Sequence, residues 1–163
     1  MAERALDVKR SPGPHNSLWY WWRILNPLRV IFNYFLMSLA RASPSLRLKN
    51  VLYRFMGARI GKHVSIGLEA TFDIFYPQLI EVGDDSIVGY NTTILCHEFT
   101  VDEYRTGRVR IGKRVTIGAN CTILPGITIK DGSTVSAHSL VNSDVDGFVG
   151  GVPARPLERK PTL

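Results

Sequence analysis

The chain has 163 residues, of which 45% are apolar and 21% are charged, and its formal net charge is +6. This composition indicates one folded domain with an appendage. It excludes a disordered chain, because there are enough apolar side chains to form a core. The two cysteines are too few for a disulfide framework and lack metal-binding spacing, which fits a reducing, cytoplasmic compartment.

The positive charge is concentrated in the first part of the chain. Residues 1–63 contain eleven Lys or Arg and two acidic residues, whereas residues 64–163 contain nine and twelve. A basic segment that is also rich in aromatic residues suits an anionic membrane surface. No nucleic-acid-binding motif accompanies this charge, so we expect no nucleic acid partner.

Two segments precede the main domain. Residues 1–16 are polar, include a Ser-Pro-Gly-Pro stretch and predict a flexible tail. Residues 17–57 predict an aromatic and amphipathic helical segment, which contains four consecutive aromatic residues at 19–22. We expect this segment either to cover the main domain that follows it or to anchor that domain.

Two helices are expected within the second segment. Pro27 suits the first turn of a helix that runs to about Ala42. A shorter helix is predicted from Leu46 to Met56, and Gly57 then ends it.

Residues 17–43 leave two interpretations open. The charge-free run from Val30 to Ala40 has eleven residues, fewer than the roughly 20 that a membrane-spanning helix needs. The first interpretation is a helix in the membrane interface, with Trp and Tyr at headgroup depth, which predicts a peripheral position on the inner face of the membrane. In the second, the apolar surface caps the following domain or packs on another subunit.

A six-residue repeat dominates residues 58–157. An aliphatic residue opens each hexad, Gly often follows it, and a small or branched residue comes four positions after the opener. Such a fixed short period is typical of a stacked repeat architecture rather than of ordinary hairpins. The openers are Ile60, Ile66, Val82, Val88, Ile94, Ile111, Ile117, Ile123, Ile129, Val135 and Val141.

Each hexad supplies one short strand and a corner, so three hexads make one triangular coil. Successive coils pair about 4.8 Å apart, with the openers inside. We therefore expect an all-β core, a parallel β-helix of about four coils, with an α-helical N-terminal extension and a C-terminal tail at 158–163. Cys121 occupies a small position and should pack inside. The open ends of the stack predict caps or oligomerisation.

The repeat is interrupted twice, and function is expected where a rigid repeat breaks. The opener that follows residues 76–81 arrives four residues late, and a charged, aperiodic stretch predicts a projecting loop at 99–110. His97 lies at the base of this loop. Because the free pKa of His suits proton transfer near neutral pH, His97 is the candidate general base.

These features resemble the hexapeptide-repeat O-acetyltransferases, of the galactoside and maltose type and the polysaccharide acyltransferase type. The resemblance covers about residues 46–157 and rests on the hexads, on His97 and on the ending Gly-Gly-Val-Pro-Ala-Arg at 150–155. It implies a left-handed β-helix and a homotrimer with active sites between subunits. It also implies acetyl-CoA, or another acyl-CoA, as co-substrate and no required metal.

The implied activity is CoA-dependent O-acyl transfer to a hydroxyl of a sugar or a lipid-linked glycan, with acetyl as the expected acyl group and His97 as the base. The resemblance also assigns contacts to the co-substrate: small residues where pantetheine passes close to the backbone, and an arginine that suits a CoA phosphate. The expected co-substrate residues are Gly118, Ala119, Ala137, Asn142, Ser143 and Arg155.

The acceptor side is assigned to acids and a tyrosine near His97. A catalytic His usually needs an acceptor for its second nitrogen, and the sequence leaves open which acid supplies it. By resemblance, Asp73 matches an acceptor-binding position, whereas Glu98 is expected to point away from His97 along the strand. The residues expected to contact the acceptor are Asp73, Glu69, Glu98, Glu103 and Tyr104.

Two other functions compete with acyl transfer. The γ-type carbonic anhydrases share this prism and hold zinc with three histidines. The four histidines of this chain show no paired spacing after the loop, which disfavours such a site. The other alternative is a non-catalytic, membrane-associated β-helix scaffold, which would have no affinity for CoA.

Overall fold

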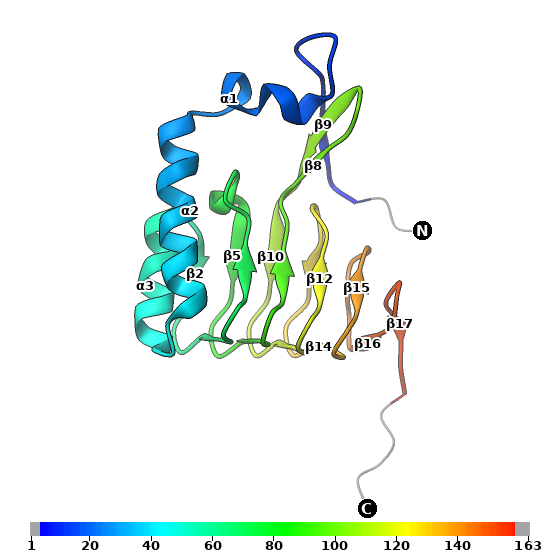
Figure 1. Cartoon of the computed structure of the whole chain (residues 1–163). Coiled ribbons are helices and arrows are strands. Elements are labelled where there is room, and N and C mark those ends of the chain that lie inside the picture. Colours follow the sequence, from blue (N-terminus) through cyan, green and yellow to red (C-terminus); the bar gives the residue numbers. More distant parts are fainter. Residues whose placement is uncertain (1–3, 159–163) are drawn as a thin grey trace, which may run out of the picture.

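The computed structural model describes residues 4–158. The molecule is a stack of triangular coils with two helices against its N-terminal end and a small sheet that projects from one side (Figure 1). The helices are η1 (Ser17–Tyr20), α1 (Trp21–Ile24), α2 (Pro27–Ala42) and α3 (Leu46–Met56), with η2 (Pro77–Leu79) in the first interruption of the repeat. The predicted all-β core with an α-helical N-terminal extension is confirmed.

Three sheets form the faces of the prism, and the strands stack in parallel within each sheet. The first face consists of β2 (Arg59–Ile60), β5 (Ile80–Val82), β10 (Val109–Ile111) and β13 (Thr128–Ile129). The second consists of β3 (Ser65–Ile66), β6 (Ile87–Val88), β11 (Thr116–Ile117), β14 (Thr134–Val135) and β16 (Phe148–Gly150), with β17 (Arg155–Pro156) added antiparallel. The third consists of β4 (Thr71–Phe72), β7 (Thr93–Ile94), β12 (Thr122–Ile123) and β15 (Leu140–Val141).

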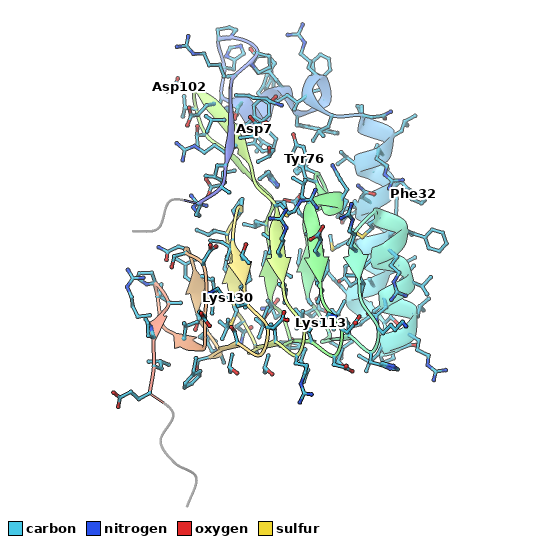
Figure 2. All side chains as sticks on the ribbon, turned by 180° about the vertical axis from the view of Figure 1, so that it is seen from behind. Asp7, Phe32, Tyr76, Asp102, Lys113 and Lys130 are labelled. Atoms are coloured by element: carbon cyan, nitrogen blue, oxygen red, sulfur yellow. The ribbon has the colours of Figure 1, made fainter. Side chains whose placement is uncertain are left out.

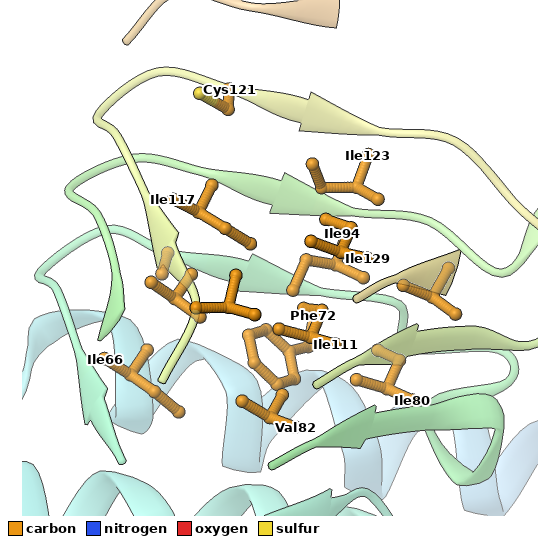
Figure 3. Close-up of a cluster of buried hydrophobic side chains, with 14 of the residues drawn as sticks. Ile66, Phe72, Ile80, Val82, Ile94, Ile111, Ile117, Cys121, Ile123 and Ile129 are labelled. Carbon is orange, nitrogen blue, oxygen red and sulfur yellow. The ribbon is translucent and has the colours of Figure 1, made fainter. Parts of the chain in front are cut away.

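The hexad openers form the core inside the prism. On the second face, Ile66, Val88, Ile117 and Val135 align in one register, and none is more than 1% exposed. Figure 3 shows such openers from different coils gathered in one apolar cluster. The predicted six-residue period therefore describes the stacking of the coils, with each opener resting on its equivalent in the next coil.

Close contact between coils explains the other positions of the hexad. A Cβ atom on Gly118 would lie 2.5 Å from the backbone nitrogen of Ala137, so only glycine fits there. At the small position, the buried Thr92 hydroxyl donates to the carbonyl of Gly118 at 2.8 Å, which satisfies both groups. Cys121 is 1% exposed, as expected for a small internal residue.

Helix α3 closes the exposed edge of the first coil. Its buried side chains Lys49, Asn50 and Tyr53 donate to backbone carbonyl groups of that coil at 2.6, 2.8 and 2.7 Å. An open strand edge is a site of unwanted pairing, and these donors occupy its acceptors. The helix ends at Gly57, whose φ of 111° lies in the left-handed region, as predicted.

A three-stranded antiparallel sheet replaces two segments that the sequence predicts as irregular. Strands β8 (His97–Phe99) and β9 (Glu103–Thr106) form a hairpin where the projecting loop is expected, and β10 already begins at Val109. Strand β1 (Asp7–Arg10) pairs with β9, so the expected flexible tail is partly a strand. Strand β1 pairs with the otherwise free edge of β9. The polar sequence of the predicted tail gives no local signal of this pairing. Residues 1–3 and 159–163, the outer parts of the two predicted tails, lie outside the described residues.

Candidate active site

His97 stands at the point where the chain leaves the prism. It follows the last strand of the second coil, β7, and opens the hairpin strand β8. Its side chain is 17% exposed. A rigid coil therefore holds the His97 backbone, while one edge of the ring remains open to solvent.

Asp73 holds the His97 ring in place through its contact with Nδ1. Its side chain has no exposed surface, and its Oδ2 atom lies 2.5 Å from Nδ1 of His97. The same carboxylate accepts three backbone N–H groups, from Phe75 at 2.8 Å, Tyr76 at 2.9 Å and Cys96 at 2.7 Å. A carboxylate with this set of donors fixes the Nδ1–H tautomer of the histidine.

The other ring nitrogen is left for chemistry. Among residues 4–158, no group is hydrogen-bonded to Nε2 of His97. An imidazole with Nδ1 donating to a buried carboxylate presents a lone pair at Nε2, and the carboxylate stabilises the positive charge when that nitrogen takes a proton. This geometry allows proton transfer at Nε2, as a general base requires.

This geometry corrects the expected role of Asp73. The sequence places Asp73 against the acceptor, but its buried oxygens are fully used by His97 and by backbone donors. The reason is the register of the coils: the backbone N–H of Asp73 donates to the carbonyl of Ile94, so Asp73 lies one coil before the corner that leads to His97. Counting the hexads from Asp73 to His97 would have predicted that the two residues lie near the same corner of the prism.

Aromatic rings surround His97 on the exposed side. The ring centroids of Phe75, Phe99 and Tyr76 lie 4.8, 5.0 and 6.2 Å from that of His97. Trp21, from the N-terminal segment, packs on Phe75 at 6.0 Å. These aromatic residues were not predicted as site residues from the sequence. Phe75 and Tyr76 nevertheless stand at the first interruption of the repeat, which was the available signal.

Burial also affects the hydroxyl of Tyr76. It raises the pKa of Tyr76 to about 12, and the neighbouring Tyr104 adds to this effect. Tyr76 is therefore a neutral hydrogen-bond donor near neutral pH. In Figure 2 its side chain lies between the coils and the projecting sheet.

The other residues predicted to contact the acceptor form ion pairs elsewhere or lie in the projecting sheet. Glu98 pairs with Arg4 at 2.6 Å, which fits its expected direction away from His97, and Glu69 pairs with Arg41 of α2 at 2.6 Å. Glu103 pairs with a neighbouring arginine of its own strand. Tyr104 lies opposite Phe99 in the hairpin, with the ring centroids 6.0 Å apart. Only Tyr104 belongs to the ring cluster near His97.

The predicted co-substrate residues occupy two corners of the prism. Asn142 and Ser143 follow β15, at the same corner as His97 but farther along the stack. Gly118 and Ala119 follow β11, and Ala137 follows β14, at the corner between the second and third faces. Arg155 is exposed at the far end, in β17. One chain therefore does not bring Gly118, Ala119 or Ala137 together with His97.

Two further features bear on the alternatives. A groove of about 1120 Å³ runs along the first face, lined by charged residues that include Arg59, Glu81 and Lys130, but His97 does not line it. Within residues 4–158, no three His, Cys, Asp or Glu side chains are grouped so that they could hold a metal ion.

Comparison with known proteins identifies relatives over most of the chain. The model of the bacterial transferase hexapeptide (six repeats) matches residues 108–143, and that of the hexapeptide repeat of succinyl-transferase matches residues 57–96. The Bacillus subtilis protein YvoF, which is named as an acetyltransferase, is 49% identical over 148 residues that cover 89% of this chain and 86% of the relative.

Solved structures agree with these matches. A hexapeptide-repeat-containing acetyltransferase from Vibrio cholerae, in complex with acetyl-CoA, superposes with a TM-score of 0.68 at 26% identity, over 80% of this chain and 86% of that one. A galactoside acetyltransferase in complex with coenzyme A has the same fold, with a TM-score of 0.62 at 23% identity over 81% and 80% of the two chains. The expected left-handed parallel β-helix is confirmed.

Proposed function

This chain belongs to the hexapeptide-repeat acetyltransferase family, and we propose that it transfers an acetyl group from acetyl-CoA to a hydroxyl of a sugar or a lipid-linked glycan. The observation that carries the proposal is the contact of 2.5 Å between Asp73 and Nδ1 of a partly exposed His97. The buried Asp73 and its backbone donors hold the His97 ring in one orientation, which supports a role in general-base catalysis.

The reaction follows from that geometry. Nε2 of His97 takes the proton of the acceptor hydroxyl, and the hydroxyl oxygen attacks the thioester carbon of acetyl-CoA. The tetrahedral intermediate collapses to the acetyl ester, and the imidazolium returns the proton to the departing CoA thiolate. Asp73 stabilises the imidazolium between these two steps.

A backbone donor is needed for the oxyanion of the intermediate. We assign it to the corner after β11. The N–H groups of Gly118 and Asn120 there already donate to Val135 and Tyr90 carbonyls at 2.8 Å. The N–H of Ala119, between them, has no partner among residues 4–158 and is the candidate.

The site is shared between subunits of a homotrimer in this proposal. His97 and the corner formed by Gly118, Ala119 and Ala137 lie on different edges of one prism. A second copy that places its small-residue corner beside His97 brings both halves together, with pantetheine against Ala119 and Ala137 and a CoA phosphate at Arg155. Asn142 and Ser143 complete the wall on the His97 side.

Acetyl transfer is tested with acetyl-CoA and a panel of sugars and polyprenyl-linked glycans. CoA release and the mass of the product are measured together. Replacement of His97 by Ala should lower turnover by about 10²–10⁴-fold, because the base is lost. His63→Asn is the matched control, since His63 is exposed, has a φ of 55° that Asn tolerates, and lies in the first coil. Equal turnover in His97→Ala and the wild type would remove the base from the mechanism.

The shared site is tested by mixing two inactive variants. His97→Ala lacks the base, and Ala137→Trp blocks the pantetheine path. In mixed trimers, an interface between a chain with an intact His97 and a chain with an intact Ala137 is complete. Random mixing then restores about a quarter of the wild-type activity. A site contained in one chain would give no recovery on mixing.

A further inference from the structure

The two N-terminal helices carry an apolar surface that the fold does not use. On α2, Val30, Asn33, Met37 and Ala40 are buried against the rest of the chain. The opposite side of the same helix exposes Leu28, Phe32, Phe35 and Leu39, with 78%, 45%, 62% and 62% of their surface accessible. In Figure 2, Phe32 points away from the coils.

Helix α3 repeats this division. Its inner side holds the residues that close the first coil, whereas Leu48, Val51 and Phe55 on the opposite side are 48%, 42% and 65% exposed. Because α2 and α3 pack side by side, the two outer sides together form one apolar surface, called here the outer helix surface. Capping the prism and facing a partner are therefore not alternatives for these helices, since each uses a different side.

Unbalanced positive charge surrounds the outer helix surface. Residues 8–68 contain ten Lys or Arg and no Asp or Glu. Arg23, Arg29, Arg47 and Arg54 are exposed, and none of them pairs with a carboxylate in residues 4–158. Exposed Trp19 and Trp22 lie in the segment that leads into α2. Apolar side chains with flanking arginines and tryptophans match the boundary of an anionic bilayer.

We propose that the outer helix surface binds anionic lipid, and holds the enzyme flat on a membrane without crossing it. No helix among the described residues is long and apolar enough to span a bilayer. A second copy docking face to face fits less well, because a symmetric contact would set unpaired arginines of equal charge against one another with no acid to separate them.

Flotation of the full chain with phosphatidylcholine vesicles, with and without phosphatidylglycerol, tests this proposal. The protein should float with the anionic vesicles and release as salt screens the lipid charge. The variant that carries Phe35→Glu and Leu39→Glu should bind about tenfold or more weakly. Val152→Glu is the matched control, because Val152 is 74% exposed at the other end of the stack.

The outcomes separate this proposal from its rivals and from the catalytic assignment. Absence of flotation with anionic vesicles overturns it, and so does equal flotation of the double variant and the wild type. A lower mass of the double variant in light scattering, without vesicle binding by the wild type, assigns the surface to a second copy instead. His97→Ala should float like the wild type, so a failed transferase assay and a failed flotation assay are distinct results.

Discussion

The coils and the projecting sheet of this molecule are built by opposite rules. In the coils, inward side chains meet their equivalents in the adjacent coils in a fixed register, as Ile117 meets Val135 and Val88. In the projecting sheet, Asp7 pairs with Thr106 and no repeat relates the partners. Asp73 comes from the first region and Phe99 and Tyr104 come from the second, so the site lies where the two regions meet.

The largest effect is expected from a charge inside the coils. Ile117→Asp buries a carboxylate in the stack of openers, and it should cost more than about 4 kcal/mol or prevent folding. Thr116→Asp is the control, because Thr116 is the exposed neighbour on the same strand. It should cost about 1 kcal/mol. Chemical denaturation measures both; similar losses would mean that the register of the core has been misassigned.

A second prediction concerns the contact that joins the two regions. Asp73→Asn should lower kcat/KM by about 10²–10⁴-fold, because the amide cannot stabilise the imidazolium. The loss should fall on kcat and leave KM nearly unchanged, because Asp73 contacts His97 and its buried oxygens do not reach the acceptor.

Glu69→Gln is the matched control for that substitution, because Glu69 forms an ion pair with Arg41 on α2 and not with His97. It should leave kcat and KM unchanged. A purely structural role for Asp73 would lower activity only in proportion to folded protein, and kcat per folded molecule would then be unchanged.

The same contrast explains what the sequence could predict. The period of six predicts the strands and the buried openers, and Pro27 and Gly57 predict where α2 begins and where α3 ends. Each of these signals depends on neighbours in sequence or on an exact repeat. His97 could also be predicted from the sequence, because it lies where the exact repeat is interrupted. The role of Asp73 depended on which corner it shares with His97, and resemblance alone placed it against the acceptor.

Contacts between distant, non-repeating segments stayed hidden. The packing of Trp21 on Phe75 and the pairing of β1 with β9 join residues more than 50 positions apart. The local patterns of β1 and β9 are a polar tail and a charged loop, and no period relates either pair of segments. Such contacts are selected by tertiary packing, which local propensity does not encode.

The smallest effect is expected from loosening the projecting sheet alone. The Ser11 N–H donates to Asp102, and alternate residues of a strand face the same side, so the N–H of Lys9 faces β9 and that of Val8 faces away. Lys9→Pro therefore removes a bond between β1 and β9, whereas Val8→Pro does not. We expect Lys9→Pro to lower kcat/KM about three- to tenfold by disordering the wall that carries Tyr104 and Phe99.

Thermal unfolding distinguishes this local effect from a global one. The prism should melt within about 2 °C of the wild type in both proline variants, because β1 contributes nothing to the stacked core. Val8→Pro should retain its activity. If Lys9→Pro lowered the melting temperature of the coils as strongly as it lowered activity, the two regions would form one cooperative unit, and the division between a rigid stack and an added wall would be wrong.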